Sequence, residues 1–114
     1  MAGAAQGGAE LFFERLAASF ATAGVTQTVM IKPDPGRMNR LAAAGVPAQG
    51  CAFSPLMAVL HKRQLATAIR KSRATVILSW MNRATGMTPR TGIPHVARLG
   101  GFYNLKYYRH CDWL

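Results

Sequence analysis

Prolines and glycines divide this chain into short segments, and they limit its fold more than any other feature. Residues 32–36 read Lys-Pro-Asp-Pro-Gly, residues 47–55 contain two prolines and a glycine, and residues 88–94 contain two prolines and a glycine. Proline lacks a backbone N–H and glycine is conformationally loose, so each of these places interrupts a helix or marks a turn. With 114 residues in all, the chain has room for one small domain built from short elements.

The first segment has the pattern of an amphipathic helix. From Ala9 onward, apolar side chains recur at helical spacing at Leu11, Phe12, Leu16 and Phe20. Two glutamates lie in the first turns, where a carboxylate favours the positive end of the helix dipole. We therefore expect a helix that begins at Ala9.

Three further elements follow from local signals. The β-branched residues in Val25–Ile31 favour an extended piece, and residues 37–44 predict a short helix that Gly45 stops. Ser54 and Pro55 fit the N-cap and first position of a helix over residues 56–72. Residues 74–81 are apolar on every side, which fits either a buried helical continuation or a short strand.

Charge is distributed very unevenly. Residues 35–111 contain twelve Lys and Arg but no Asp or Glu, within a chain of net charge +10. On a helical wheel, five basic residues gather on one half of the predicted helix over residues 56–72 and just beyond it: Lys62, Arg63, Arg70, Lys71 and Arg73. This basic face predicts contact with anionic lipid or acidic subunits, with RNA phosphates as the alternative and a merely solvated face as the third interpretation.

The C-terminal segment, residues 86–114, is rich in aromatic residues and poor in patterns of regular structure. Its predicted anchors to partner chains are Phe102, Tyr103, Tyr107, Tyr108 and Trp113. Because basic residues are interleaved with these rings, stacking on unpaired bases is the alternative.

Sequence spacing offers little chemistry. The possible metal ligands Cys51, His61, His95, His110 and Cys111 are far apart or directly adjacent, whereas structural zinc sites use pairs two to four residues apart, so no metal and no cofactor are expected. The acid-free middle supplies no carboxylate to orient a histidine, and no phosphate-binding glycine loop is present. We therefore expect no enzymatic activity and no small-molecule substrate.

The predicted fold is mostly α, with two or three helices and an extended, partner-held tail. Much of the apolar content is alanine, with 19 in the chain, and alanine buries little area, so no independent globular core is expected. The predicted organisation is a flexible or partner-held arm at residues 1–8, a helical region at 9–85 and the aromatic, basic tail at 86–114.

The function predicted from these features is that of a non-catalytic accessory subunit in a large organellar complex. High apolar content with a basic face favours the mitochondrial inner membrane and a respiratory or ATP-synthase-type assembly. The alternative is a mitochondrial ribosomal protein that binds rRNA through the basic helix and the tail. Whether the uncharged residues 41–60 cross a membrane is left open, because prolines, a glycine and a glutamine interrupt them.

Overall fold

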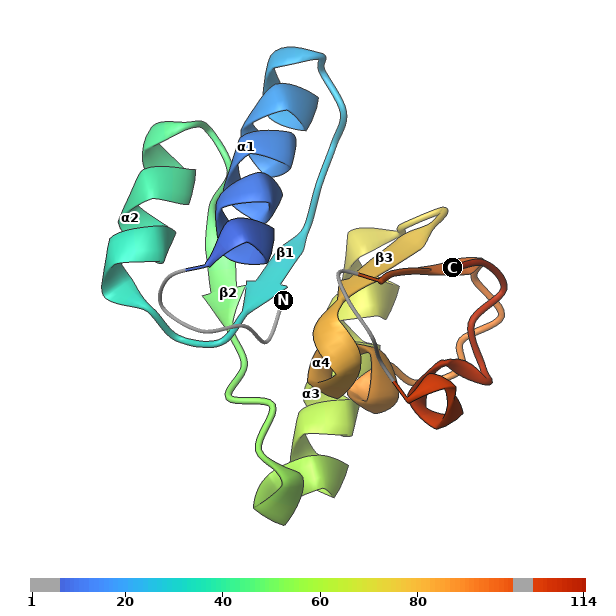
Figure 1. Cartoon of the computed structure of the whole chain (residues 1–114). Coiled ribbons are helices and arrows are strands. Elements are labelled where there is room, and N and C mark those ends of the chain that lie inside the picture. Colours follow the sequence, from blue (N-terminus) through green and yellow to red (C-terminus); the bar gives the residue numbers. More distant parts are fainter. Residues whose placement is uncertain (1–6, 100–103) are drawn as a thin grey trace.

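The computed structural model describes residues 7–99 and 104–114, which form alternating helices and strands (Figure 1). In chain order the elements are α1 (Gly8–Thr22), β1 (Val29–Ile31), α2 (Pro35–Ala43), β2 (Ala48–Gly50), the 3₁₀ turn η1 (Pro55–Met57), α3 (Ala58–Ser72), β3 (Ile77–Trp80), α4 (Met81–Met87), β4 (His95–Arg98) and the 3₁₀ turn η2 (Leu105–Tyr108). The sequence of strand, helix and strand recurs, which is typical of α/β proteins with parallel strands.

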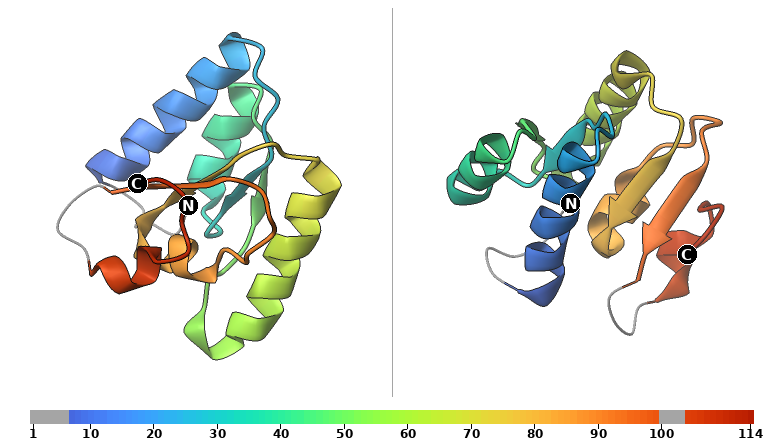
Figure 2. Two further views of the ribbon diagram at one scale, coloured as in Figure 1. Left: turned by 90° about the vertical axis from the view of Figure 1, so that its right-hand side faces the viewer. Right: turned by 90° about the horizontal axis from the view of Figure 1, so that it is seen from above.

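The strands form two parallel pairs. β1 pairs with β2 and β3 pairs with β4, the second pair in a register that sets Ile77 beside His95 and Trp80 beside Arg98. The β3–β4 pair lies on the β1 side of the first pair (Figure 2), where Trp80 packs against Val29 and Ile31. The strands are therefore ordered β2, β1, β3, β4 in space, but the two pairs are separate sheets, because no ladder joins the described residues of β1 and β3.

Helices cover both faces of this layer. On one face, α1 and α2 pack Phe13, Ala17 and Leu41 against β1 and Trp80. On the other face, α3 and α4 pack Leu65, Ala84 and Met87 around Cys51 and Phe53. The α1–α2 cluster joins the two strand pairs through Trp80, and the three layers of helix, strand and helix resemble a doubly wound α/β fold whose strands fall into two separate pairs.

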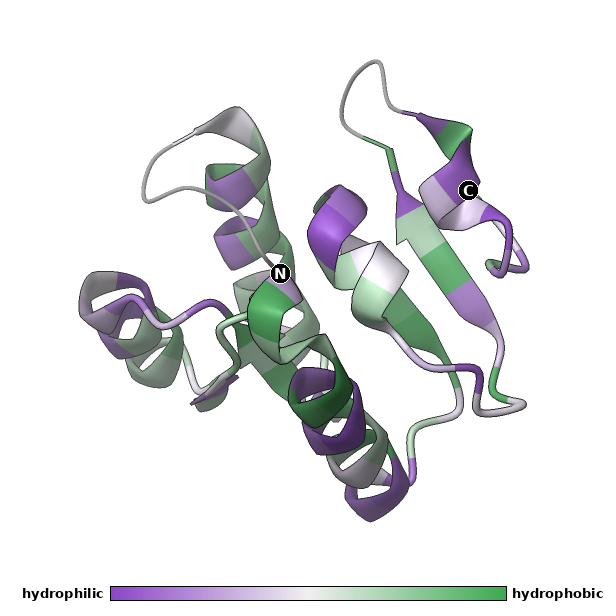
Figure 3. Ribbon diagram, turned by 90° about the horizontal axis from the view of Figure 1, so that it is seen from below, coloured by the Kyte–Doolittle hydropathy of each residue, from purple (hydrophilic) through white to green (hydrophobic). Residues whose placement is uncertain are grey.

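Residue alternation along the strands explains the division into two cores. In β1, Val29 and Ile31 belong to the α1–α2 cluster, whereas Met30 packs against the α3–α4 cluster. A strand that is covered on both faces needs apolar residues at successive positions, as β1 has. Colouring by hydropathy shows helices that mix hydrophilic and hydrophobic residues, while β1, with the sequence Val-Met-Ile, is apolar throughout (Figure 3).

Several local expectations are confirmed. The N-terminal helix, the extended piece within Val25–Ile31 and the short helix before Gly45 are all present, and the apolar segment over residues 74–81 contains strand β3. Asp34 is the N-cap of α2, and its Oδ1 accepts a hydrogen bond from the N–H of Arg37 at 3.0 Å. Gly45 has φ 81°, the left-handed conformation that glycine adopts without strain.

The predicted fold class is wrong. The chain has a core on each face of its strand layer, and strands in two parallel pairs, β1 with β2 and β3 with β4, replace the mostly α arrangement expected for it. The alanines do not prevent a core, because large side chains such as Trp80, Phe13, Phe53 and Leu65 are buried within it.

The expectation of a partner-held tail is also wrong for the residues that the structure describes. Residues 95–98 form β4, and Trp113 makes a parallel bridge with Val96. Tyr108 is buried, and its hydroxyl donates a hydrogen bond to Asn82 Oδ1 on α4. The tail is thus held largely by its own chain.

The predicted serine cap is absent, although the helix that it was meant to start is present. Ser54 makes no side-chain capping bond; its backbone N–H donates instead to His61 Nδ1 at 3.0 Å, and a 3₁₀ turn precedes α3. Among residues 7–99 and 104–114, no helix has the length and apolar character needed to span a bilayer.

Replacing Trp80 by alanine is expected to lower the free energy of unfolding by about 3–5 kcal/mol, because its ring joins the two strand pairs. The matched control is Trp113→Ala, since the Trp113 side chain is 60% exposed and its loss is expected to change stability by less than about 0.5 kcal/mol. Urea unfolding followed by circular dichroism measures both. Equal effects of the two substitutions would contradict the role given to Trp80.

Candidate anion-binding site at the carboxyl ends of the strands

After the carboxyl ends of β1 and β3, the chain passes to opposite faces of the strand layer. After β1 it enters α2 on one face, and after β3 it enters α4 on the other face. In open α/β sheets the place where neighbouring strands connect to opposite faces forms a crevice that binds ligands. Met81, the residue directly after β3, has φ 72°, a strained conformation for a side chain of this size. The carboxyl edge of the strands is therefore the candidate ligand-binding site of this fold.

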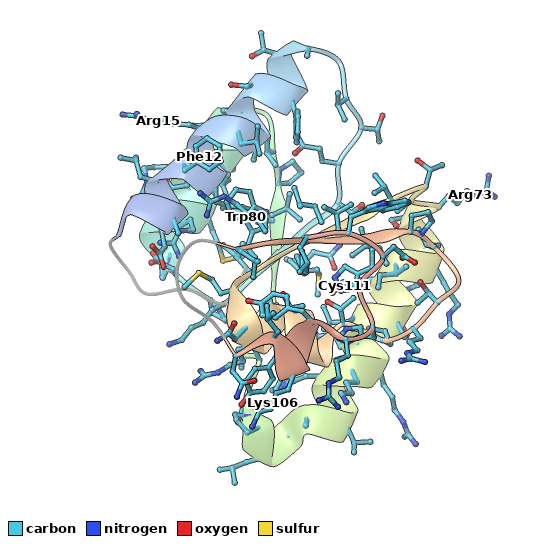
Figure 4. The ribbon with its side chains drawn as sticks, turned by 45° about the vertical axis from the view of Figure 1, so that its right-hand side comes forward. Phe12, Arg15, Arg73, Trp80, Lys106 and Cys111 are labelled. Atoms are coloured by element: carbon cyan, nitrogen blue, oxygen red, sulfur yellow. The ribbon has the colours of Figure 1, made fainter. Side chains whose placement is uncertain are left out.

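Arg98 ends β4 at the same edge, and its guanidinium lies against two aromatic rings. The carbon Cζ is 4.9 Å from the centroid of Phe12 and 4.9 Å from that of Trp80. The two rings are themselves 5.7 Å apart, and Figure 4 shows them close together beside α1. Cation–π contact of this kind fixes the guanidinium without using its N–H groups.

Two other arginines near this edge form ion pairs with carboxylates. Arg37 is buried with its Nε 3.0 Å from Glu14 Oε1, and Arg40 Nη2 is 2.8 Å from the same oxygen. The hydrogen bond from Arg40, followed by that from Arg37, lowers the pKa of Glu14 against the opposing effect of burial. The ion pairs among the described residues all use Glu14 or Asp34, and none includes Arg98. Arg98 is thus a fixed cation at the carboxyl edge with N–H groups available for an anion.

An apolar cavity of about 270 Å³ lies between β1 and β3, and its walls come from α1 and α3. Its lining reaches from Trp80 toward the amino ends of the strands, where Val25 and Ala74 contribute. It offers few polar groups to fix a ligand, so we assign it no role in binding an anion.

A second polar cluster lies on the α4 face, at the amino end of β4. His95 is buried, and its Nε2 is 2.8 Å from Ser79 Oγ, which is in turn 2.8 Å from Thr85 Oγ1. The ring of His110 lies 5.3 Å from that of His95, and Cys111 Sγ lies 3.7 Å from His95 Nδ1. Of these side chains, His95, His110 and Cys111 are the candidate metal ligands among the described residues.

Burial sets the ionisation of this cluster. It lowers the pKa of His95, as does the charge of His110, whereas Asp112 acts in the opposite direction. Burial also raises the pKa of the Cys111 thiol, with a smaller contribution from Asp112. Both groups therefore favour their neutral forms.

The residues predicted from sequence lie elsewhere. All five residues of the basic face are exposed on α3 or just after it, and Figure 4 shows Arg73 pointing away from the body of the molecule. Their contact with lipid, RNA or acidic subunits stays a prediction. Of the five tail anchors, Tyr108 is buried, Tyr107 lies under Lys106 Nζ at 5.2 Å, Trp113 is exposed, and Phe102 and Tyr103 fall outside the described residues.

The sequence analysis named His95, His110 and Cys111 among possible metal ligands but rejected them for their spacing, and it did not single out Arg98, because strand register assembles both clusters. Arg98 meets Trp80 only through the β3–β4 pairing, and Phe12 comes from a helix 86 residues earlier in the chain. The available signal for Arg98 was an apolar segment that ends in Trp80, followed by a second short segment that ends in a basic residue.

Comparison with known proteins gives one significant similarity among curated proteins. The chain is 31% identical over 109 residues to the lipopolysaccharide core biosynthesis glycosyltransferase LpsE of Rhizobium meliloti (strain 1021). The alignment covers 93% of this chain but 32% of that enzyme, so the chain spans about a third of the length of its relative. No protein-family profile and no solved structure matches.

This similarity corrects the functional predictions. The relative is a bacterial enzyme, so the expected role as an accessory subunit of a mitochondrial inner-membrane complex is wrong, and the ribosomal alternative falls with it. The expectations of a non-enzymatic chain and of mitochondrial localisation are overturned by the same finding. Net charge and apolar content led to the wrong function because they are totals over the chain and do not determine how its strands pair.

Glu14→Gln is expected to remove part of the acid sensitivity of the fold. The pKa of Glu14 is lowered from 4.5 in the folded chain, so its carboxylate stabilises the fold above that pH and this contribution is lost as pH falls below it. Urea unfolding at a series of pH values between about 3 and 6 measures the effect. The wild type should lose more stability than the variant over this range; parallel pH profiles would show that the ion pairs of Glu14 add nothing.

Proposed function

We propose that this chain is part of a glycosyltransferase that acts on a lipopolysaccharide-type glycan, and that its carboxyl edge binds a phosphate-bearing saccharide substrate. The class of enzyme comes from the similarity to LpsE, which extends over 93% of this chain. The location of the site comes from the doubly wound strand order, in which the carboxyl edge is the usual binding crevice.

The single structural observation that carries the proposal is the position of Arg98. A guanidinium presents its N–H donors in a plane that matches two oxygens of a phosphate. The rings of Phe12 and Trp80 already hold the Arg98 guanidinium in place, so less side-chain freedom is lost when an anion binds. An exposed lysine at the same edge, Lys32, adds positive potential without a fixed geometry.

Glycosyl transfer gives such a cation a chemical role. The bond between the sugar carbon and its leaving group breaks, a bond to the acceptor hydroxyl oxygen forms, and the hydroxyl proton passes to a base. When the leaving group is a phosphate, negative charge grows on its oxygens as the bond breaks. A guanidinium fixed beside that oxygen stabilises the charge without having to reorganise. If the phosphate belongs to the acceptor instead, Arg98 positions the acceptor and takes no part in the charge change.

The proposal predicts that Arg98→Ala weakens binding of phosphorylated sugars by about tenfold to a hundredfold, the usual effect of removing hydrogen bonds to a charged group. Titration of the chain with glucose, glucose 1-phosphate and UDP-glucose, followed by Trp80 fluorescence in a Trp113→Phe background, measures it. Arg98→Lys should recover only part of the affinity, because an ammonium lacks the planar pair of donors.

Arg70→Ala is the matched control, because it removes the same charge from the exposed face of α3. Equal losses in Arg70→Ala and Arg98→Ala would mean that general electrostatic attraction holds the ligand. Equal affinity for glucose and its phosphorylated forms would remove the anion from the proposal altogether. A preference for UDP-glucose over glucose 1-phosphate would favour the sugar donor as the ligand.

A further inference from the structure

The cluster at the amino end of β4 depends on pairing between β4 and the segment that follows η2. The N–H of Ala97 donates to the carbonyl of Trp113 at 2.8 Å, and the N–H of Asp112 donates to the carbonyl of His95 at 2.8 Å. This backbone pairing sets His110 and Cys111 beside His95, although fourteen residues separate His95 from His110 in the sequence. The arrangement is therefore built by the backbone and does not rely on flexible side chains alone.

The hydrogen bonds around His95 fix which ring nitrogen carries the proton. Thr85 Oγ1 donates its only hydrogen to the carbonyl of Met81 at 3.0 Å, so Ser79 must donate in the Ser79–Thr85 pair. Ser79 then accepts from His95 Nε2, which therefore bears the hydrogen. The lone pair of the neutral imidazole is left on Nδ1, and Nδ1 is the atom that lies 3.7 Å from Cys111 Sγ.

The same reasoning applies to His110. Its Nε2 lies 3.0 Å from the backbone carbonyl oxygen of Thr85, which can only accept. Nε2 therefore donates, and in the neutral ring Nδ1 again keeps its lone pair. Two imidazole lone pairs and one thiol thus belong to residues whose ligand atoms all lie within 4.8 Å of one another.

We propose that His95, His110 and Cys111 bind a zinc-class divalent cation through two imidazole nitrogens and one thiolate. Two nitrogens and one sulfur are a donor set that suits Zn²⁺. Ligand bonds of about 2.0–2.3 Å place tetrahedral ligand atoms roughly 3.3–3.8 Å apart, so the three side chains need to close by about 1 Å. The thiol releases one proton as its sulfur bonds to the metal.

The surroundings have the features of a metal site. Ser79 and the Thr85 carbonyl hold the second nitrogens of the two imidazoles, as outer partners do for zinc-bound histidines. A surface cleft of about 420 Å³, lined by residues 89–95 and 109–113, borders the three side chains and gives a water molecule access to the fourth position. Because the cluster lies at the amino end of β4 and Arg98 ends the same strand, the cation would fasten the segment after η2 to the sheet and would not contact the anion.

Titration of the reduced, metal-stripped chain with Co²⁺ tests the proposal. Cobalt in a tetrahedral site with a thiolate ligand gives visible bands together with a near-ultraviolet sulfur-to-metal charge-transfer band. We expect both at one Co²⁺ per chain, displacement of Co²⁺ by Zn²⁺, and a higher melting temperature with Zn²⁺. Absence of the charge-transfer band, or of saturable 1:1 binding, overturns the proposal.

Variants identify the ligands. Cys111→Ser should abolish the charge-transfer band, whereas Cys51→Ala, which removes the other thiol from the α3–α4 core, should leave it unchanged. His110→Asn should weaken Zn²⁺ binding by at least tenfold. Ser79→Ala, which removes an outer partner and no ligand, should weaken it about tenfold to a hundredfold while the band is kept. A band that survives Cys111→Ser, or that disappears in Cys51→Ala, contradicts the assignment, and the wild-type spectrum decides the matter if a variant does not fold.

Discussion

The packing of Trp80 holds the molecule together. Its ring lies 5.3 Å from Phe13 in an edge-on contact, packs with the apolar side chains of β1, and supports the guanidinium of Arg98. Within the part of the chain that the structure describes, no ladder hydrogen bonds join the two strand pairs, so side-chain packing fixes their relative position. The same residue therefore determines both the continuity of the α1–α2 core and the geometry of the carboxyl edge.

The sequence specifies local elements well and their pairing poorly. Asp34 caps the start of α2, Pro35 is its first residue, and Gly45 follows its end in the left-handed conformation. These signals are local, so they can be recognised in the sequence alone. Whether residues 74–81 form a strand depends on a pairing partner. That partner is β4, and it lies in residues 86–114, where the glycines and prolines predicted no regular structure. The two clusters could not be predicted for the same reason, since each joins residues through the register of a parallel pair.

Acidic residues are scarce, and their placement decides which cations remain available. Glu14 on α1 is shared by Arg37 and Arg40 of α2, and Asp34 adds a second negative charge 3.9 Å from Arg37, so two carboxylates balance two guanidinium groups where these helices meet. Arg98 lies against the rings of Phe12 and Trp80 instead, and the ion pairs of the described residues do not include it. The acid-free stretch that dominates the sequence is thus less uniform than it looks, because its arginines have different partners.

β4 is four residues long, and its two ends carry groups of different chemistry on opposite faces. His95 and Arg98 are three positions apart, which at about 3.3 Å per residue is roughly 10 Å along the strand. A cation held at one end and an anion held at the other would attract each other over a distance close to the screening length of about 8–10 Å. Occupation of either position would then raise the affinity of the other by the same factor. The strand would act as a spacer that couples two binding equilibria through the electrostatic attraction between their ligands.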